Sequence, residues 1–210
     1  MAVKKWTRDG KAEVIAKGWG GKALLRQNFI NPDTDKQLDF TLWGVAKKDG
    51  EVLLTGWSTI IMAVTENLEI IAVRQFRQGA NEITLEVPGG NPNPNFEDNS
   101  PETVGVRELG EEAGYTPRKV VRLAEHAFFE PSSLVNGYYP CLALGCYPTP
   151  ETKENNSNEQ TETVLIPMEE YLQMALSGQI LDSKTGLLLV MSLPHILGVD
   201  AETLARKIIA

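Results

Sequence analysis

The chain has 210 residues, of which 28 are acidic and 20 basic, so its formal net charge is −8 at pH 7. This length allows a sizeable buried core, the hydrophobic fraction of 42% excludes wholesale disorder, and the acidic excess argues against non-specific binding to nucleic acid. Because no apolar run approaches the roughly 18 residues of a membrane span and no secretory signal is visible, we expect a cytoplasmic protein without a membrane partner. Cys141 and Cys146 are too few for a disulfide framework.

The first third of the chain is expected to be rich in β-structure, because apolar or alternating stretches recur there between turn signals. The predicted strands are 23–29, 38–45, 52–54 and 58–64. Asp49-Gly50, after two lysines, predicts a hairpin turn. We place a boundary after residue 56, so that 1–56 form an N-terminal β-rich lobe and 57–210 form a second domain.

The rest of the chain combines predicted strands with a few helices. The strands are expected at 68–76, 83–87, 120–129, 138–146 and 164–166, and helices at 168–177, 183–193 and 201–209. Pro194 is expected to end the second of these helices, and Asp200 to cap the third. The polar segment 148–160 is expected to be a surface loop. Strands flanked by a few helices predict an α+β protein.

A further helix is predicted directly after Ser100, which is a good N-cap residue. Pro101 suits the first helical position, Glu102 is favourable near the positive end of the helix dipole, and Gly114 is a plausible end. Gly105 in the middle costs about 1 kcal/mol relative to alanine. We interpret Gly105 as a sign that this helix packs closely against the sheet.

This helix carries an unusual concentration of carboxylates. Glu108 and Glu112 are four residues apart and therefore share one face, with Glu111 three residues from Glu108. Residues 97–112 contain six acidic residues and one basic residue, a local charge of −5. A hard divalent cation such as Mg²⁺ or Mn²⁺, bound through oxygen ligands, would relieve the repulsion. The alternative is that these are solvated glutamates on an exposed helix face.

The nine residues Arg107-Glu108-Leu109-Gly110-Glu111-Glu112-Ala113-Gly114-Tyr115 match the second half of a known motif. They resemble the box of the Nudix hydrolases, G-x5-E-x7-R-E-U-x-E-E-x-G-U, where U is a bulky apolar residue. The resemblance implies a Nudix α/β/α sandwich with a mixed sheet, in which Glu108 and Glu112 ligate metal and Glu111 lies close by as a further catalytic candidate.

The first half of the box departs from the family pattern. Asn99 stands where the family usually has a glutamate that supports the box, in part by pairing with the arginine, and the preceding loop is three residues longer. Glu97 or Asp98 is a possible substitute. The departure motivates an alternative reading, a Nudix module that binds a nucleotide as a sensor without cleaving it.

The flanking residues narrow the resemblance. Arg74-Gln75-Phe76-Arg77 and Glu86-Val87-Pro88-Gly89-Gly90 are similar to patterns in ADP-ribose and nucleoside-diphosphate-sugar pyrophosphatases. This similarity implies that the backbone carbonyl of Gly89 is a metal ligand. Arg77 is the first candidate for binding a diphosphate, because a guanidinium can hold two phosphate oxygens, and Arg74 is the second. Both are alternatively solvated arginines at a strand end. Glu86 is either an additional acid near the metal or the structural partner of an arginine.

The general base of this subgroup often comes from a glutamate pair that precedes a strand well after the box. Glu159-Gln160-Thr161-Glu162 occupies that place, and we expect Glu159 to be the base, with Glu162 as the second candidate. Chance glutamates in a polar loop are the alternative.

The resemblance therefore implies an enzyme that uses Mg²⁺ or Mn²⁺ to hydrolyse the diphosphate bond of ADP-ribose or a related nucleoside diphosphate sugar. The products would be a nucleoside monophosphate and a sugar phosphate. GDP-mannose, another such sugar or a dinucleotide is an alternative substrate, and the flanks disfavour a nucleoside triphosphatase. The partner is a small molecule, not nucleic acid. The N-terminal β-rich segment resembles the small lobe through which this subgroup dimerises, which implies a homodimer.

Overall fold

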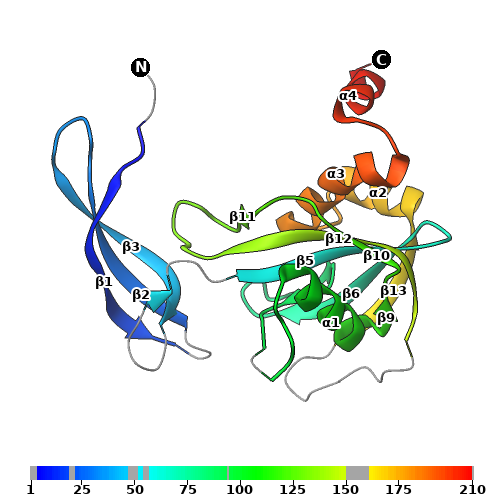
Figure 1. Cartoon of the computed structure of the whole chain (residues 1–210), viewed down its shortest axis with the longest axis horizontal. Helices are drawn as coiled ribbons and strands as arrows, with labels where there is room; N and C mark the ends of the chain where they lie inside the picture. Colours follow the sequence, from blue (N-terminus) through cyan, green and yellow to red (C-terminus); the bar gives the residue numbers. More distant parts are fainter. Residues whose placement is uncertain are drawn as a thin grey trace. The chain divides into compact units, whose positions relative to one another are not determined.

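The structure is a computed structural model that describes residues 4–18, 22–46, 52–53, 57–93, 95–149 and 161–209 (Figure 1). The described residues divide into two compact units. The first comprises those of Met1–Trp57 together with Ala127–Tyr138, and the second comprises those of Ser58–His126 together with Tyr139–Ala210. No helix in these ranges is long and apolar enough to cross a membrane.

The first unit is built on an antiparallel sheet in the order β1-β2-β3-β4. Its strands are β1 (Thr7–Lys17), β2 (Lys22–Ile30), β3 (Gln37–Ala46) and β4 (Val52–Leu53). The register pairs Leu25 with Leu42, and these two side chains form a small core with Ala23 and Val135. The β-rich character of this region follows the expectation, although β1 was not among the predicted strands. The predicted turn at Asp49-Gly50 lies outside the described residues.

The segment Ala127–Tyr138 belongs to the first unit, although the sequence-based boundary left it in the second domain. The Trp43 amide donates to the Ser133 carbonyl over 2.7 Å, and the Val135 amide donates to the Trp43 carbonyl over 2.9 Å. These bonds and the buried Val135 tie the segment to β3. The unit is therefore discontinuous in sequence, because a distant loop supplies part of its core.

The second unit contains the larger sheet, whose central order is β10-β12-β5-β6-β13. These strands are β10 (Lys119–Arg122), β12 (Gly137–Pro148), β5 (Trp57–Thr65), β6 (Glu69–Arg77) and β13 (Thr161–Pro167). Three short strands pair at its margins: β7 (Glu82–Glu86) with β6, β8 (Gly89–Gly90) with β5, and β9 (Tyr115–Thr116) with β12. A further short strand, β11 (Ala127–Phe128), belongs to the first unit and pairs with Gly137 and Tyr138 at the start of β12. The predicted strand 120–129 is thus divided between β10 and β11.

Four helices complete the described fold: α1 (Pro101–Ala113), α2 (Met168–Leu176), α3 (Ser183–Leu197) and α4 (Ala201–Ile209). In Figure 1, α1 lies on one side of the larger sheet and α2 and α3 lie on the other. Strands and helices combine in an α+β fold, as predicted. The expectation that Pro194 ends α3 is wrong: the helix continues to Leu197 and ends at Gly198, which has a φ of 64°. Proline removes only its own amide donor, so one further turn can form before a left-handed glycine stops the helix.

The core of the second unit fixes α1 against the sheet. Leu109 and Ala113 of α1 pack with apolar side chains of three strands, namely Ile61, Ala63, Ile71, Val73, Cys141, Ala143 and Cys146. A Cβ atom on Gly105 would lie 3.0 Å from Thr59 Cγ2 and 3.1 Å from Ile61 Cδ1. The expected close packing of Gly105 is therefore present, and it sets the distance between α1 and β5.

Candidate active site

The ends of α1 are determined by local chemistry. Ser100 is the N-cap: its hydroxyl accepts from the Thr103 amide over 3.2 Å, while Thr103 Oγ1 accepts from the Ser100 amide over 3.1 Å. At the other end Gly114 adopts a φ of 75°, and its amide donates to the Gly110 carbonyl over 2.9 Å. Both predicted ends are confirmed. Together with the buried apolar face, these ends determine which side chains of α1 point toward β8.

Two carboxylates of α1 meet the paired glycines of β8. The amide of Gly89 donates to Glu112 Oε2 over 3.0 Å. The carboxylate of Glu108 lies directly against Gly90, because a Cβ atom there would be 2.2 Å from Glu108 Oε1. Strand β8 is held in place by pairing with Thr59 and Ile60. The structure thus brings together Glu108, Glu112 and Gly89, the three residues expected to hold a metal.

Arg107 ties the carboxylates of the motif to the loop before α1. Its guanidinium bonds Asp98 Oδ2 over 2.9 Å, Glu108 Oε1 over 2.9 Å and Glu111 Oε2 over 2.6 Å. It also donates to the Asn91 carbonyl over 2.8 Å. Burial disfavours the charged form, but the hydrogen bond to Asp98 and the charges of Glu108 and Glu111 outweigh it and raise the pKa of Arg107. Arg107 therefore remains a cation at the centre of an acidic cluster.

Asp98 supports Arg107 in place of the glutamate that the family pattern usually has where this chain has Asn99. Its side chain is only 5% exposed, and besides Arg107 it accepts from the Asn93 amide over 2.7 Å. Burial acts to raise the pKa of Asp98, but the hydrogen bonds from Arg107 and Asn93 prevail and lower it. Of the two substitutes considered from the sequence, Asp98 and not Glu97 makes this pair.

Arg77 and Glu86 form a bidentate ion pair across the β6–β7 hairpin. Arg77 Nε donates to Glu86 Oε1 over 2.6 Å, and Nη2 donates to Oε2 over 2.5 Å. Glu86 is 4% exposed, and Thr84 Oγ1 also donates to it over 2.6 Å. Burial acts against ionisation, but these hydrogen bonds hold the pKa of Glu86 below its ordinary value. Glu86 is thus the structural partner of an arginine, the second of the two roles considered.

The charges of Glu112 and Asp182 also act on Arg77. Its pKa is raised first by the hydrogen bond to Glu86 and then by the charge of Glu86, with further contributions from Glu112 and Asp182, although burial opposes the shift. The side chain remains 42% exposed, and its Nη1 group takes no part in the pair with Glu86. This arrangement leaves one amino group of an oriented guanidinium available for a phosphate oxygen.

Glu162 and Arg74 do not join this cluster. They pair with each other over 3.5 Å on neighbouring strands, and both side chains are exposed. The flanking Thr161 and Thr163 hydroxyls donate to the Glu112 carbonyl over 3.1 and 3.4 Å, so alternation along β13 directs Glu162 to the face away from α1. Glu159 lies outside the described residues.

The donor set at β8 fits a hard divalent cation. Two carboxylates and a nearby backbone carbonyl are oxygen donors of the kind that Mg²⁺ accepts, since it usually takes one or two protein carboxylates and keeps several waters. No group of three or more His, Cys, Asp and Glu side chains arranged to hold a metal occurs in the described ranges. A metal here would accordingly complete its coordination with water and substrate oxygens, and it would share Glu108 with Arg107.

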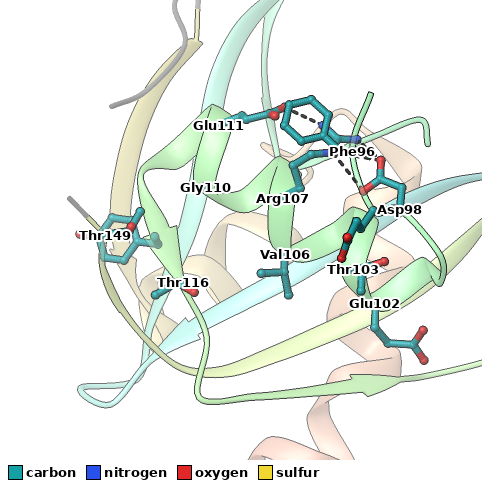
Figure 2. Close-up of a pocket in the computed structure, with 12 residues that line it drawn as sticks. Phe96, Asp98, Glu102, Thr103, Val106, Arg107, Gly110, Glu111, Thr116 and Thr149 are labelled. Carbon is teal, nitrogen blue, oxygen red and sulfur yellow. Dashed lines mark hydrogen bonds and ion pairs between the residues drawn. The ribbon is translucent and has the colours of Figure 1, made fainter. Parts of the chain in front are cut away.

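A cavity of about 520 Å³ lies on the opposite side of α1 (Figure 2). It is lined by the helix residues Thr103, Val106, Arg107 and Gly110, whereas Gly105, Glu108 and Glu112 occupy the other face. Figure 2 shows Arg107 between Asp98 and Glu111, with the Phe96 ring over its guanidinium. The remaining ionisable lining is acidic, which disfavours a phosphate ligand. We therefore assign the candidate site to the β8 side of the helix.

Comparison with known proteins identifies the family and the fold. A family model described as the NUDIX domain matches residues 54–185. ADP-ribose pyrophosphatase of Bacillus subtilis (strain 168) is 29% identical over 136 residues, which cover 64% of this chain and 71% of that protein. A crystal structure of an ADP compounds hydrolase superposes with a TM-score of 0.73 and 15% identity over 94% of this chain and 97% of that one, which shows a shared fold. With its motif on α1 and a family match over more than half of its length, the chain belongs to the Nudix family.

Proposed function

We propose that this Nudix hydrolase cleaves the diphosphate bond of ADP-ribose or a closely related nucleoside diphosphate sugar, giving a nucleoside monophosphate and a sugar phosphate. The observation that carries the proposal is the convergence of Glu108 and Glu112 on Gly89 and Gly90. Arg77, whose pKa is raised in part by the charge of Glu112, adds an oriented cation for the diphosphate. Similarity to an ADP-ribose pyrophosphatase supports the substrate class.

Each group of this cluster has a chemical role in the proposal. Glu108, Glu112 and the Gly89 carbonyl would hold Mg²⁺ or Mn²⁺, which when bound neutralises phosphate oxygens and lowers the pKa of water. Arg77 binds a diphosphate oxygen through Nη1, while Glu86 holds the guanidinium plane in place. A carboxylate accepts the proton of the attacking water.

For that proton acceptor we propose Glu159, with Glu162 and Glu111 as the other candidates. Glu111 is engaged with Arg107, and Glu162 with Arg74 on the face away from α1. Glu159→Gln and Glu162→Gln form a matched pair that separates the two loop glutamates. We expect Glu159→Gln to lower kcat by at least about 100-fold, in the range of general-base catalysis, and Glu162→Gln to stay within about threefold of wild type. The reverse order would assign the base to Glu162.

The substrate is tested with a panel of phosphate esters. The protein is incubated with Mg²⁺ and ADP-ribose, GDP-mannose, UDP-glucose, a dinucleoside polyphosphate or a dNTP, and released phosphomonoesters are measured. We expect ADP-ribose to give the highest kcat/KM. Faster cleavage of GDP-mannose would keep the reaction and change the substrate, and a preference for dNTPs would contradict the proposal.

A nucleotide sensor without catalysis is the second candidate. The presence of Asn99 favours the sensor, because the glutamate that usually supports the motif is missing at that position. The Asp98–Arg107 pair weighs against it, since another carboxylate from the same loop now supports the arginine. Tight binding of one panel member without turnover of any would establish the sensor.

We also propose that the protein is a homodimer formed through its first unit. Large apolar side chains are exposed on β1 and β3, namely Ile15, Leu38, Phe40 and Trp43. Leu38 and Phe40 share one face of β3, and large apolar side chains on one exposed face commonly mark protein interfaces. Sedimentation equilibrium of the wild type and of Trp43→Ser tests this assignment: a monomeric wild type would refute it.

A further inference from the structure

A single buried threonine connects α3 to the strand end that precedes the site. The amide of Val87 donates to Thr185 Oγ1 over 3.2 Å, although the two residues are 98 positions apart. Thr185 is completely buried, and its own hydroxyl donates to Asp182 Oδ2 over 2.8 Å. Because the amide can only donate, the direction of this two-bond chain is fixed: it runs from Val87 through Thr185 to Asp182.

Asp182 is itself anchored at the start of α3. It is the N-cap residue, and Oδ2 also accepts from the Thr185 amide over 3.0 Å. Oδ1 contacts the ammonium group of Lys184, which lies 3.9 Å from Glu86 Oε2. The first turn of α3 therefore contacts two consecutive residues, Glu86 through a charge and Val87 through a hydrogen bond.

Only Pro88 separates this tether from the glycines of β8. Its ring restricts the backbone, and its carbonyl accepts from the Ile61 amide over 2.9 Å. The next amide, of Gly89, holds Glu112. A change in the position of Val87 is consequently passed through a stiff connection to Gly89 and to the carboxylate that it positions.

We propose that the first turn of α3, acting through Thr185, is a positioning element for Gly89 and Glu112. The inference rests on the proposed function for its effect on turnover, but its effect on the metal-binding carboxylates can be measured without substrate. Thr185 is not a catalytic residue, because it touches the backbone of Val87 and the side chain of Asp182 and not the reacting groups. Loss of a direct hydrogen-bond partner of a metal ligand commonly costs about 10- to 100-fold in metal affinity or activity. Thr185 acts on Gly89 through two further residues, so that range is the upper bound for its effect.

The test compares three substitutions in one helix. Thr185→Val keeps the shape and removes the hydroxyl, and Thr185→Ser keeps the hydroxyl. Ser192→Ala is the matched control, since Ser192 is also a buried hydroxyl of α3 and makes no hydrogen bond in the described structure. Mn²⁺ affinity is measured by electron paramagnetic resonance without substrate, and kcat and KM with ADP-ribose are measured on the same samples.

We expect Thr185→Val to weaken Mn²⁺ binding by about tenfold and to lower kcat by about 10- to 100-fold, with KM within about twofold. Thr185→Ser and Ser192→Ala should remain close to wild type. Unchanged Mn²⁺ affinity in folded Thr185→Val, or an equal loss in Ser192→Ala, would overturn the proposal. A wild type that binds Mn²⁺ but cleaves no panel member would refute the proposed function alone, because the Mn²⁺ comparison would still decide the role of Thr185.

If Thr185→Val does not fold, Thr185→Ala replaces it, because alanine also lacks the hydroxyl that accepts from Val87 and has the highest helix propensity. Hydrogen exchange of the Val87 amide supplies an independent readout. It should accelerate in Thr185→Ala relative to Ser192→Ala, together with a weaker affinity for Mn²⁺. Exchange at Val87 that matches the control would contradict the tether.

Discussion

Substitution by alanine should have different effects at the two adjacent glycines of β8. At Gly90 it should lower turnover, and at Gly89 it should lower stability. Neither Gly89 nor Gly90 has a left-handed backbone, so alanine can adopt the conformation at both positions. What differs is the atom that the new Cβ would meet. At Gly90 it is the carboxylate of Glu108, at the end of a flexible side chain, and at Gly89 it is the backbone of β5.

For Gly90→Ala the Cβ atom would lie 2.2 Å from Glu108 Oε1 and 2.4 Å from Cδ. Non-bonded carbon and oxygen atoms need well over 3 Å, so the carboxylate has to move by about 1 Å. A misplacement of this size at a reacting centre can cost about 100-fold in rate. The backbone is not displaced, and we expect the melting temperature to stay within about 4 °C of wild type, equivalent to about 1 kcal/mol.

For Gly89→Ala the Cβ atom would lie 2.5 Å from the Thr59 carbonyl oxygen and 3.0 Å from Ile60 Cα. These backbone atoms belong to a paired strand, so β8 must separate from β5. Overpacking of this kind costs about 1–3 kcal/mol. That cost corresponds to a fall in melting temperature of about 2–12 °C for a protein of this size.

The assay combines thermal unfolding with kcat for ADP-ribose at saturating Mg²⁺. The expected pattern is a stable Gly90→Ala with kcat lowered by about 100-fold and a destabilised Gly89→Ala. A Gly90→Ala variant with wild-type kcat would refute the reasoning, because it would show that the position of Glu108 against Gly90 does not matter to the reaction.

Three further predictions follow from the same cluster. Glu112→Gln keeps an acceptor for the Gly89 amide, so we expect little loss of stability but a fall in kcat of orders of magnitude; near-normal turnover would exclude Glu112 from the mechanism. Mg²⁺ should raise the melting temperature of the wild type but not of this variant, since a ligand stabilises only the state that binds it, and an equal rise in both would place the metal elsewhere. Asp98→Asn should lower stability at neutral pH. Because the folded pKa of Asp98 lies below its ordinary value of 3.8, its contribution is complete above that pH and is lost as the pH falls through the folded value. The difference in melting temperature from wild type should therefore be constant between about pH 5 and 7 and shrink as the pH falls below the ordinary pKa, and a difference that grows on acidification would contradict the ion-pair explanation.

Local signals in the sequence predicted the elements that carry the site. Ser100, Pro101 and Gly114 define α1 within one residue, because caps act through neighbouring backbone groups. The spacing of Glu108 and Glu112 placed both on one face, and Gly105 indicated the close approach to β5. Each of these inferences depends on residues within one helix.

The features that the sequence missed or left open depend on the path of the folded chain, not on local spacing. The hydrogen bond between Val87 and Thr185 joins residues 98 positions apart, and no periodic pattern in the sequence predicts it. The choice of Asp98 over Glu97 depends on the path of a loop, which places one carboxylate next to Arg107 and exposes the other. Glu162 was named as a candidate base because of its place in the sequence; the register of β13 pairs it with Arg74, and its catalytic role stays a prediction.

The discontinuity of the first unit also bears on how the protein matures during synthesis. The ribosome synthesises β1, β2, β3 and β4 first. Their core, however, includes Val135, and the Trp43 amide bonds the carbonyl of Ser133, so both contacts need a later segment of the chain. This unit cannot reach its final packing until more than 130 residues have been translated, by which time α1 and several strands of the larger sheet have also been made. The usual order, in which an N-terminal domain folds before its successor, cannot be completed here. A nascent chain stalled before Ala127 should therefore expose Leu25 and Leu42 to protease, and release of the full chain should protect them.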